Sequence, residues 1–339
     1  MNELRMAVIG VGRLGLVHSE NLARRVKGVH LVAVSTSDPE RAAKVQQNCG
    51  TVTVYPTPEA LLDSEELDAV VIASTTSVHR DNVELCAAAG VHMLCEKPLA
   101  LTMADCDRAI AAADKAEVKL MIGHVRQFDA GYIEAKRLVE AGAIGQPVVY
   151  RGISGDVNPP APDFADLAVS GGLILDSMYH DIYLARWLMA DEVCRVYGEG
   201  GALVDEGVRS VGDVDNAVVS IRFARGAMGT LTATRVTRYG HDLRGEVIGD
   251  EGAVQIGHLR HTPVRLLDRQ GVHHDMAHTT AERMGGALVT ELQAFVNCVL
   301  DDTDPPVTVM DGRTTLAVAL AARRSIQSGK AEELVVGAR

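Results

Sequence analysis

The sequence contains no long apolar run and no paired cysteines. No stretch approaches the ~18 consecutive apolar residues of a membrane-spanning helix, and the early apolar stretch 6–11 is too short and too rich in glycine for a signal peptide. The six cysteines form no Cys-x-x-Cys pair, which argues against a zinc site and against a disulfide framework. We therefore expect a cytoplasmic protein without bound metal, in which the thiols are free.

The sequence also lacks a basic patch, internal repeats and low-complexity segments. It has 33 Lys and Arg against 45 Asp and Glu, a formal net charge of -12, so nucleic acid and anionic membranes are poor partners. An apolar fraction of 47% with 23% charged residues is typical of a globular protein. A length of 339 residues favours two domains over one.

The first third of the chain alternates strand and helix signals. Its apolar runs are short and lack polar alternation, as in parallel strands that are buried on both faces. The expected strands are Met6–Ile9, Leu31–Ser35, Val52–Tyr55, Ala69–Ala73, His92–Cys95 and Lys119–Ile122. This pattern predicts an α/β domain with a doubly wound parallel Rossmann sheet over residues 1–123.

Beyond residue 123 the pattern changes to alternating strands with short turns. Helices are expected at 131–141, 173–189, 290–300 and 312–328. The expected strands are Val193–Gly198, Asn216–Phe223, Met228–Arg235, Leu243–Gly249, Ala253–Ile256 and Val264–Leu267. We predict an α+β domain with an antiparallel sheet over residues 124–339.

A glycine-rich turn joins the first expected strand to the first helix. Gly10 permits the tight turn, Gly12 lets the backbone approach a pyrophosphate, and Gly15 allows close packing of helix on strand. Backbone amides at the helix start then face the phosphates. The candidate dinucleotide contacts here are Gly10, Gly12, Arg13, Leu14 and Gly15. Arg13 is either a phosphate contact or a solvated side chain.

The end of the second expected strand bears on the choice of cofactor. NAD enzymes usually carry an acid there for the ribose hydroxyls, but this chain has Ser35, Thr36 and Ser37. Hydroxyls do not repel a 2'-phosphate, and Arg41 can pair with one. Asp38, which follows, is better explained as a helix cap than as a ribose contact. The cofactor is therefore NAD or NADP, with NADP slightly favoured.

Two more segments follow strands at the edge of the sheet where ligands of such folds bind. The first contributes Ser74, Thr75, Thr76 and His79, which either line the nicotinamide half of the cofactor or cap the next helix. The second is Glu96-Lys97-Pro98. The Lys97 ammonium can stabilise an alkoxide as hydride leaves carbon, with Glu96 orienting it; the alternative is a solvated lysine.

Asp176 and His180 lie four residues apart, on one face of an otherwise apolar helix. Such a pair is costly in an apolar setting unless it is partnered or functional, and a neutral histidine is a natural acceptor for a hydroxyl proton. The alternative is a structural hydrogen bond. Histidines between residues 258 and 278 show no carboxylate or thiolate at metal-ligand spacing and are treated as surface residues.

These motifs together resemble those of the glucose-fructose oxidoreductase and inositol dehydrogenase superfamily, most closely its inositol 2-dehydrogenases. The likeness covers nearly the whole chain. Glu96-Lys97-Pro98 and the Asp176-x-x-x-His180 pattern are specific to the superfamily, while the stretches 126–129 (Arg-Gln-Phe-Asp) and 239–242 (Tyr-Gly-His-Asp) point to the inositol branch.

The resemblance implies a Rossmann domain followed by a substrate domain whose large open sheet commonly forms a homodimer or homotetramer. It also implies a catalytic set of Lys97, Asp176 and His180, with Arg126, Asp156 and Tyr239 as substrate contacts. The chain departs from the family at two positions. Thr36 replaces the acid of NAD-preferring relatives. Tyr183, a further candidate substrate contact, stands where inositol enzymes often have an acid, which favours a ring with a different hydroxyl pattern.

We therefore expect an NAD(P)-dependent oxidoreductase that oxidises a secondary hydroxyl of an inositol-like polyol, or of a sugar, to a ketone. An NADPH-dependent keto-sugar reductase is the enzymatic alternative. A non-catalytic NAD(P)-binding sensor is less well supported, because a sensor has no chemical need for Lys97, Asp176 and His180 together.

Overall fold

The computed structural model describes residues 3–160, 162–257, 262 and 264–335, and the chain forms two compact units. The first unit contains Met1–Phe128 and Gly286–Leu316, and the second contains Asp129–Gly285 and Ala317–Arg339. The sequence prediction placed everything after residue 123 in one domain. The structure differs, because the segment 286–316 returns to the first unit.

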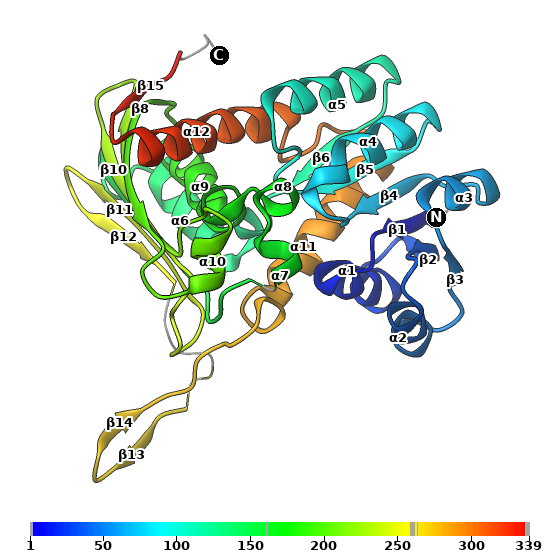
Figure 1. The fold of residues 1–339 in the computed structure, drawn as a ribbon, viewed down its shortest axis with the longest axis horizontal. Helices are drawn as coiled ribbons and strands as arrows, with labels where there is room; N and C mark the ends of the chain where they lie inside the picture. The colour runs from blue at the N-terminus through cyan, green and yellow to red at the C-terminus, as the bar shows by residue number, and fades with distance from the viewer. Residues whose placement is uncertain (1–2, 161, 258–261, 263, 336–339) are drawn as a thin grey trace. The chain divides into compact units, whose positions relative to one another are not determined.

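The first unit is built on a six-stranded sheet with the order β3-β2-β1-β4-β5-β6, in which every pair is parallel (Figure 1). Its strands are β1 (Leu4–Ile9), β2 (Val29–Ser35), β3 (Thr53–Tyr55), β4 (Ala69–Ile72), β5 (His92–Glu96) and β6 (Leu120–Gly123). The predicted doubly wound sheet is confirmed. The strand order reverses between β1 and β4, where the carboxyl ends of such strands form a ligand crevice.

Helices cover both faces of this sheet. They are α1 (Arg13–Arg24), α2 (Pro39–Cys49), α3 (Pro58–Ser64), α4 (His79–Ala88) and α5 (Met103–Lys115), with short helical turns η1 (Thr76–Val78) and η2 (Val125–Phe128). Side chains start several of them: Thr57 accepts a bond from the Ala60 amide, and Thr102 from the Asp105 amide. In Figure 1, α1 and α2 lie together on one face, and α4 and α5 on the other.

The first unit is completed by the later part of α11 (Thr280–Leu300). Gln293 on this helix accepts a bond from the Lys27 amide and donates to the Lys27 carbonyl. Leu300 packs over Gly28, where a Cβ would lie 3.2 Å from it. These contacts place α11 beside the end of α1.

The second unit is built on a seven-stranded sheet with the order β12-β11-β7-β10-β9-β8-β15. Its strands are β7 (Pro147–Gly155), β8 (Val193–Gly201), β9 (Asn216–Phe223), β10 (Met228–Thr234), β11 (Asp242–Gly249), β12 (Ala253–Ile256) and β15 (Glu332–Glu333). All pairs are antiparallel except β10 with β7. The antiparallel sheet is confirmed, but its interior strand β7 was not among the predicted strands.

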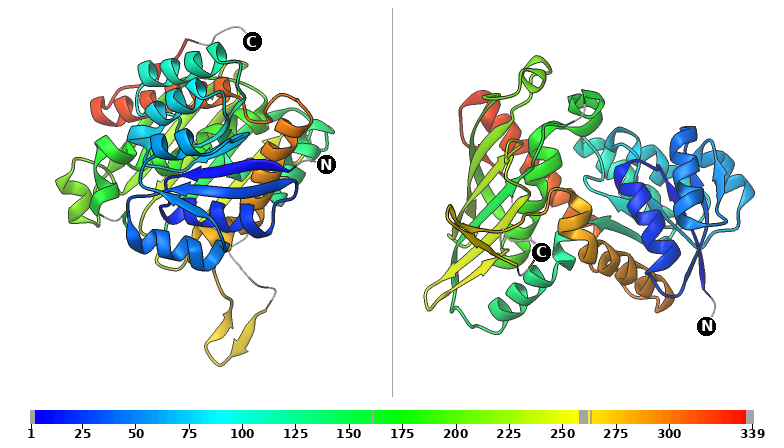
Figure 2. Two further views of the ribbon diagram at one scale, coloured as in Figure 1. Left: turned by 90° about the vertical axis from the view of Figure 1, so that its right-hand side faces the viewer. Right: turned by 90° about the horizontal axis from the view of Figure 1, so that it is seen from below.

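Helices α6 (Ala130–Glu140), α9 (Tyr179–Met189) and residues 317–328 of α12 (Val309–Ser328) lie against one face of this sheet (Figure 2). Shorter elements are α7 (Pro162–Ala165), α8 (Leu167–Ser170), η3 (Ile174–Met178) and α10 (Glu206–Ser210). A separate hairpin, β13 (Leu266–Asp268) with β14 (Gly271–His273), projects from the unit.

Two further observations concern the length of the helices and the state of the cysteines. Among the described residues, no helix combines the length and apolarity that crossing a bilayer demands. The six cysteines are free thiols, and burial raises the pKa of Cys86 and of Cys106 to about 12. These two thiols are therefore unreactive at neutral pH.

Candidate functional site

The glycine turn of the first unit is shaped by two positions that admit no side chain. Gly10 has a φ of +87°, and a Cβ on it would lie 2.6 Å from the Ser74 backbone. A Cβ on Gly15 would lie 2.0 Å from the Gly10 carbonyl oxygen. Both contacts are with backbone atoms, so neither can be relieved by a flexible side chain. The turn is thereby held against the loop that follows β4.

The remaining glycine of the turn, Gly12, has a different environment. A Cβ on Gly12 would meet nothing within 4 Å. Gly12 is the N-cap of α1, makes no side-chain capping bond, and no acid occupies the first turn of the helix. Unpaired amides at a helix start attract anions, so the open space beside Gly12 fits a dinucleotide pyrophosphate. Arg13, the first residue of the helix, is exposed.

The carboxyl end of β2 provides hydroxyls and a helix cap. Asp38 accepts bonds from the backbone amides of Glu40 and Arg41 at 2.9 and 3.2 Å, and its carboxylate lies 3.1 Å from the Arg41 guanidinium. The preferred explanation of Asp38 as a cap is therefore confirmed. The same ion pair engages Arg41, which reduces the positive charge available to a 2'-phosphate. Ser35 is buried and Thr36 half-buried.

His79 connects the loop after β4 to the turn after β5. Its ring nitrogens lie 3.0 Å from the Ser74 carbonyl and 2.9 Å from the Pro98 carbonyl. Burial lowers the pKa of His79, and a neutral ring has one N–H to donate. The ring is 1% exposed, so the structure places it between the two loops. Thr75 is exposed, while Thr76 begins η1 and is buried.

Glu96 and Lys97 stand at the carboxyl end of β5. Glu96 is buried, and its Oε2 accepts a bond of 3.3 Å from the Lys97 backbone amide. The Lys97 side chain is half-buried. Arg126, the predicted substrate contact of this unit, is 5% exposed in η2. Lys97 therefore directly follows the buried end of strand β5.

The second unit holds Asp176 and His180. Asp176 lies in η3, a π-helical turn that leads directly into α9, on which His180 stands. Such turns insert an extra residue into a helix and are frequent at functional sites. Asp176 Oδ2 lies 3.2 Å from Arg235, whose guanidinium is 2% exposed and also contacts Asp213 at 3.1 Å. A buried cation therefore holds Asp176 in place.

A second set of contacts surrounds Asp156. One oxygen of this carboxylate accepts a bond of 2.6 Å from Ser177, the residue next to Asp176, and the other lies 3.5 Å from His241 Nδ1. The structure thus brings two predicted site residues, Asp156 and Asp176, onto neighbouring segments. The unit also holds a hollow of about 360 Å³, lined by Val157, Asn158, Pro159, Val204, Asp205, Arg235, Val236 and Arg238, a size that suits a small ligand.

The remaining predicted substrate residues are placed differently. Tyr239 is 56% exposed and donates a bond of 3.0 Å to Asp242, which is held in turn by Arg244. Tyr183 is 3% exposed, within α9. His273, His274 and His278 are exposed, as expected of surface residues, whereas His258 and His261 lie outside the described residues.

Sequence reasoning missed several polar residues that hold this site. Arg235 directly follows the strand β10 and ended one of the expected strands. It was not selected as a site residue, because a charged residue at a strand end is usually solvated. Asp213 lies in a loop and carries no pattern, and His241 lies in the 239–242 stretch but was given no role of its own. His18 lies 78 residues before Glu96 in the sequence, and Glu291 lies much further along the chain on α11. Long-range pairing of this kind leaves no periodic signal.

Each unit therefore supplies one set of chemical groups. The first offers a helix start for phosphates and a lysine at a strand end. The second offers a histidine, and carboxylates held by arginine, serine and histidine, all suited to hydroxyl groups. The first set can bind a dinucleotide, and the second can bind a polyol and accept a proton.

Comparison with known proteins finds two matching family descriptions. Residues 4–124 match "Oxidoreductase family, NAD-binding Rossmann fold". Residues 132–255 match "GFO/IDH/MocA C-terminal domain". The two matches cover most of the chain and follow the same order as the two sheets.

Full-length relatives have similar names. The chain is 38% identical over 336 residues to myo-inositol 2-dehydrogenase of Thermotoga maritima, covering 98% of this chain and 100% of the relative. It is 37% identical over 335 residues to scyllo-inositol 2-dehydrogenase (NAD(+)) of Bacillus subtilis, covering 99% and 97%. The crystal structure of myo-inositol 2-dehydrogenase from Lactobacillus plantarum aligns with a TM-score of 0.94 at 30% identity, covering 98% and 100%.

Proposed function

Because the chain belongs to the GFO/IDH/MocA oxidoreductase family, we propose that it is an inositol dehydrogenase, which oxidises one secondary ring hydroxyl to a ketone with NAD(H). The observation that carries this proposal is the full-length similarity to two inositol 2-dehydrogenases, in a chain that keeps Lys97, Asp176 and His180. The substrate class is a cyclic polyol. Neither the keto-sugar reductase nor the cofactor sensor is supported by the relatives.

Three side chains carry the proposed chemistry. His180 accepts the proton of the reacting hydroxyl, and Lys97 stabilises the developing alkoxide through its positive charge. Asp176, held by Arg235 at 3.2 Å, binds a substrate hydroxyl and favours the reactive form of the imidazole. When bound, the nicotinamide of the cofactor accepts the hydride.

Further residues bind the two ligands in this proposal. Gly10, Gly12, Arg13, Leu14 and Gly15 hold the pyrophosphate, Ser35, Thr36, Ser37 and Arg41 surround the adenosine ribose, and Ser74, Thr75, Thr76, His79 and Glu96 shape the nicotinamide side. Arg126, Asp156, Tyr183 and Tyr239 contact the polyol. The hydrogen bonds that fix Asp156 and the burial of Arg126 support their roles, since preorganised groups bind without further ordering.

For the cofactor we propose NAD, with NADP accepted at least as well. The printed name of the Bacillus relative specifies NAD(+). The hydroxyls of Ser35, Thr36 and Ser37 replace the usual acid and do not repel a 2'-phosphate, and the Asp38 carboxylate beyond them is paired with Arg41. The Asp38–Arg41 ion pair weakens the argument from positive charge, and the preference for NADP therefore rests mainly on the hydroxyls.

Thr36→Asp tests this assignment. An added carboxylate near the ribose should weaken NADP binding by roughly 1 to 3 kcal/mol and spare NAD. Fluorescence titration of both cofactors measures the effect, with Ser64→Asp as the control, because Ser64 is exposed on α3 in the same unit. A wild type that binds NAD far more tightly than NADP refutes the NADP proposal.

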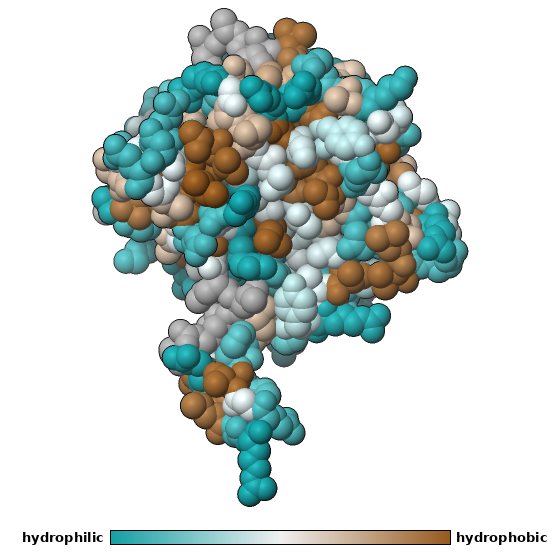
Figure 3. Space-filling view, turned by 90° about the vertical axis from the view of Figure 1, so that its left-hand side faces the viewer, coloured by the Kyte–Doolittle hydropathy of each residue, from teal (hydrophilic) through white to brown (hydrophobic). Residues whose placement is uncertain are grey.

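We also propose that the protein is a homodimer or homotetramer formed through its open sheet. One face of this sheet packs against helices, and the opposite face exposes Val218 (50%), Met228 (52%) and Tyr197 (39%). Apolar patches lie among polar ones in the space-filling view, and another lies on the projecting β13–β14 hairpin (Figure 3). Exposed apolar clusters of this kind are typical of interfaces.

The proposed function is tested by a substrate panel. Purified protein is mixed with myo-inositol, scyllo-inositol and a set of aldoses, each with NAD and with NADP, and nicotinamide absorbance is followed. We expect turnover with at least one inositol and weaker turnover with aldoses. Activity confined to aldoses, or reduction of keto-sugars without inositol oxidation, contradicts the proposal.

A further inference from the structure

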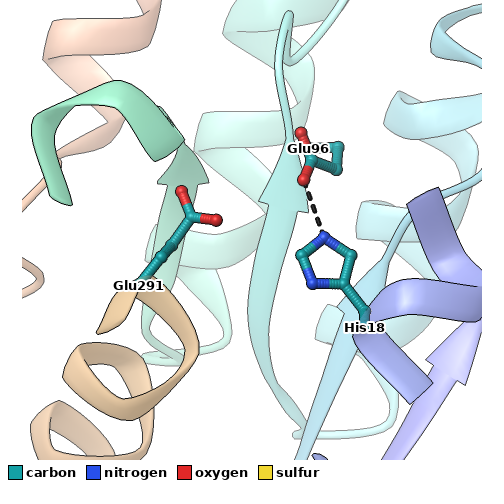
Figure 4. A group of neighbouring side chains, drawn as sticks. All are labelled: His18, Glu96 and Glu291. Carbon is teal, nitrogen blue, oxygen red and sulfur yellow. Dashed lines mark hydrogen bonds and ion pairs between the residues drawn. The ribbon is translucent and has the colours of Figure 1, made fainter. Parts of the chain in front are cut away.

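Three buried ionisable side chains from distant parts of the sequence meet inside the first unit. They are His18 on α1, Glu96 at the end of β5 and Glu291 on α11, and their ligand atoms all lie within 4.8 Å of one another (Figure 4). His18 and Glu291 are 0% exposed and Glu96 is 6% exposed. All three belong to the same compact unit. We call them the buried triad.

Each oxygen of Glu96 lies within hydrogen-bond distance of a nitrogen. His18 Nε2 lies 2.8 Å from Oε1, and the Lys97 backbone amide donates to Oε2 at 3.3 Å. Gly123 on the neighbouring strand β6 leaves room for this carboxylate, because a Cβ there would lie 3.1 Å from Oε2. Glu96 therefore connects helix α1 to the residue that carries the proposed catalytic ammonium.

Glu291 is in a different situation. Neither of its carboxyl oxygens has a hydrogen-bond partner among the described residues, and its carboxyl group extends from α11 on the side of Glu96 and His18 (Figure 4). Burial, with the nearby Glu96 charge, raises the pKa of Glu291 well above its usual value. Two adjacent buried carboxylates do not both ionise readily.

We propose that Glu96 and Glu291 hold one proton between them at neutral pH, carried by Glu291, and that the buried triad positions Lys97. With the proton on Glu291, Glu96 remains an anion and accepts from both His18 and the Lys97 amide. If Glu291 also ionised, repulsion would displace Glu96 from these donors. The catalytic consequence rests on the proposed function; the protonation state does not.

The other ionisable groups near Glu96 fit this assignment. Cys95 precedes it, and burial raises the pKa of that thiol well above its usual value. Burial lowers the pKa of His79 on α4. Lys97, the next residue in the chain, is the positively charged residue that follows Glu96.

A divalent cation is the competing occupant. Two carboxylates and an imidazole are suitable ligands for one, and a bound cation would also offset the charge of the triad. The proton and the cation differ in their response to Glu291→Gln. Glutamine has the shape of the protonated acid, so it preserves a proton-bearing triad, but it removes an anionic ligand from a metal site.

Infrared difference spectroscopy and metal analysis test the protonation state without substrate. At about pH 8, where an ordinary glutamate is ionised, the wild type should show the carbonyl band of a protonated carboxyl group. Glu291→Gln should abolish this band. Glu59→Gln, at an exposed position on α3, should keep it. Absence of the band, or one equivalent of divalent metal in purified protein, overturns the proposal.

Thermal melting of the unliganded protein gives a second readout. A glutamate whose pKa is higher in the folded state loses its proton first in the unfolded state, near the ordinary pKa of about 4.3. Its contribution to wild-type stability should therefore decline as pH rises from about 4.3 toward the folded-state pKa. Glu291→Gln cannot lose a proton, so it should melt above the wild type at about pH 8, and the gap should narrow toward about pH 5. A variant less stable than wild type at both pH values contradicts proton sharing.

The positioning role is tested by the pH profile of inositol oxidation. Glu291→Gln should retain kcat within about threefold at neutral pH and extend activity to higher pH, because its triad has no proton to release. An unchanged alkaline limb, with the infrared band present, would refute positioning. Absence of all inositol oxidation in the wild type would count against the proposed function alone, since infrared and melting need no substrate.

Discussion

Lys97 follows a buried strand and His180 follows a π-helical turn, so both side chains start from well-packed backbone. Cys95 and the two strand residues before it are fully buried, and Glu96 holds the Lys97 amide at 3.3 Å. On the other unit, Asp176 is fixed by an arginine that is 2% exposed. Charged groups that are held in this way can stabilise a developing charge without reorganising.

The first prediction concerns these two residues. Lys97→Ala and His180→Ala should each lower kcat by a factor on the order of 100 or more, because one removes charge stabilisation and the other removes the proton acceptor. Dinucleotide affinity should change little. Steady-state kinetics and fluorescence titration measure both, with Lys44→Ala as a control at an exposed lysine of α2. Near wild-type turnover in both variants would show that the assigned roles are wrong.

Most of these residues were accessible from the sequence, but their partners were not. Lys97 and the Asp176–His180 pair lie in recognisable local motifs. Arg235, which binds Asp176, and Glu291, which faces Glu96, lie far away in the chain. Contacts of this kind depend on which elements the fold brings together, and single-sequence patterns do not encode them.

At the scale of elements, the glycines of the turn that leads into α1 have two different roles: Gly15 is needed for packing, and Gly12 leaves space for a ligand. Gly15→Ala should reduce stability or prevent folding, because its Cβ would lie 2.0 Å from the Gly10 carbonyl oxygen. Gly12→Ala should melt near the wild-type temperature but bind NAD at least tenfold more weakly, since its new methyl group fills the space left for the pyrophosphate. Calorimetry of both variants measures melting and binding. Unimpaired NAD binding by Gly12→Ala would contradict the placement of the phosphates.

Asp215 organises the loop before α10. Burial alone would raise its pKa, but backbone amides of Asp205, Leu203 and Val204 donate to it at 2.7 to 2.8 Å, and the net effect lowers the pKa. A lowered carboxyl pKa means that stability is present above the unfolded value, about 3.9, and is lost as pH falls through the folded value.

Asp215→Asn should therefore reduce the free energy of unfolding by about 1–3 kcal/mol at neutral pH. The difference from wild type should narrow as pH falls below about 4, because the wild-type carboxylate is then protonated. Urea unfolding at several pH values provides the measurement. A difference that is independent of pH would show that the ionised carboxylate is not responsible.

The sequence predicted most strands, but not β7 or the short strands β14 and β15, and it did not predict the π-helical turn. The strand β7 contains Gly152 and Gly155, and glycine normally weakens a strand. Here it serves close packing: a Cβ on Gly152 would lie 3.2 Å from Asp181, and one on Gly155 would lie 2.5 Å from Thr237. A single inserted residue in η3 leaves the apolar pattern nearly unchanged, so the sequence read as one continuous helix over 173–189.

At the scale of the whole molecule, the net charge and the exposed apolar surface have opposite effects on self-association. The net charge of -12 opposes contact between copies at long range, so association requires a sizeable apolar area to offset it. The open face of the second sheet has the exposed apolar side chains for this, centred on Val218 and Met228.

Val218→Glu should therefore shift the protein toward a smaller species. A glutamate at this position places an unpaired charge within the proposed interface, which is costly when buried. Size-exclusion chromatography with light scattering should show a dimer or tetramer for the wild type and for Val211→Glu, an exposed control position outside the sheet. A monomeric wild type would contradict the assembly proposal.

The most direct test of the account follows the hydrogen that is transferred. Myo-inositol or scyllo-inositol carrying deuterium on its ring carbons is incubated with the protein and NAD, and the products are examined by nuclear magnetic resonance. The account predicts a ring ketone together with reduced cofactor that carries one deuterium on its nicotinamide ring, and no such product from Lys97→Ala at matched times. Formation of neither product with either inositol, in a protein that binds NAD, would contradict the assignment as an inositol dehydrogenase.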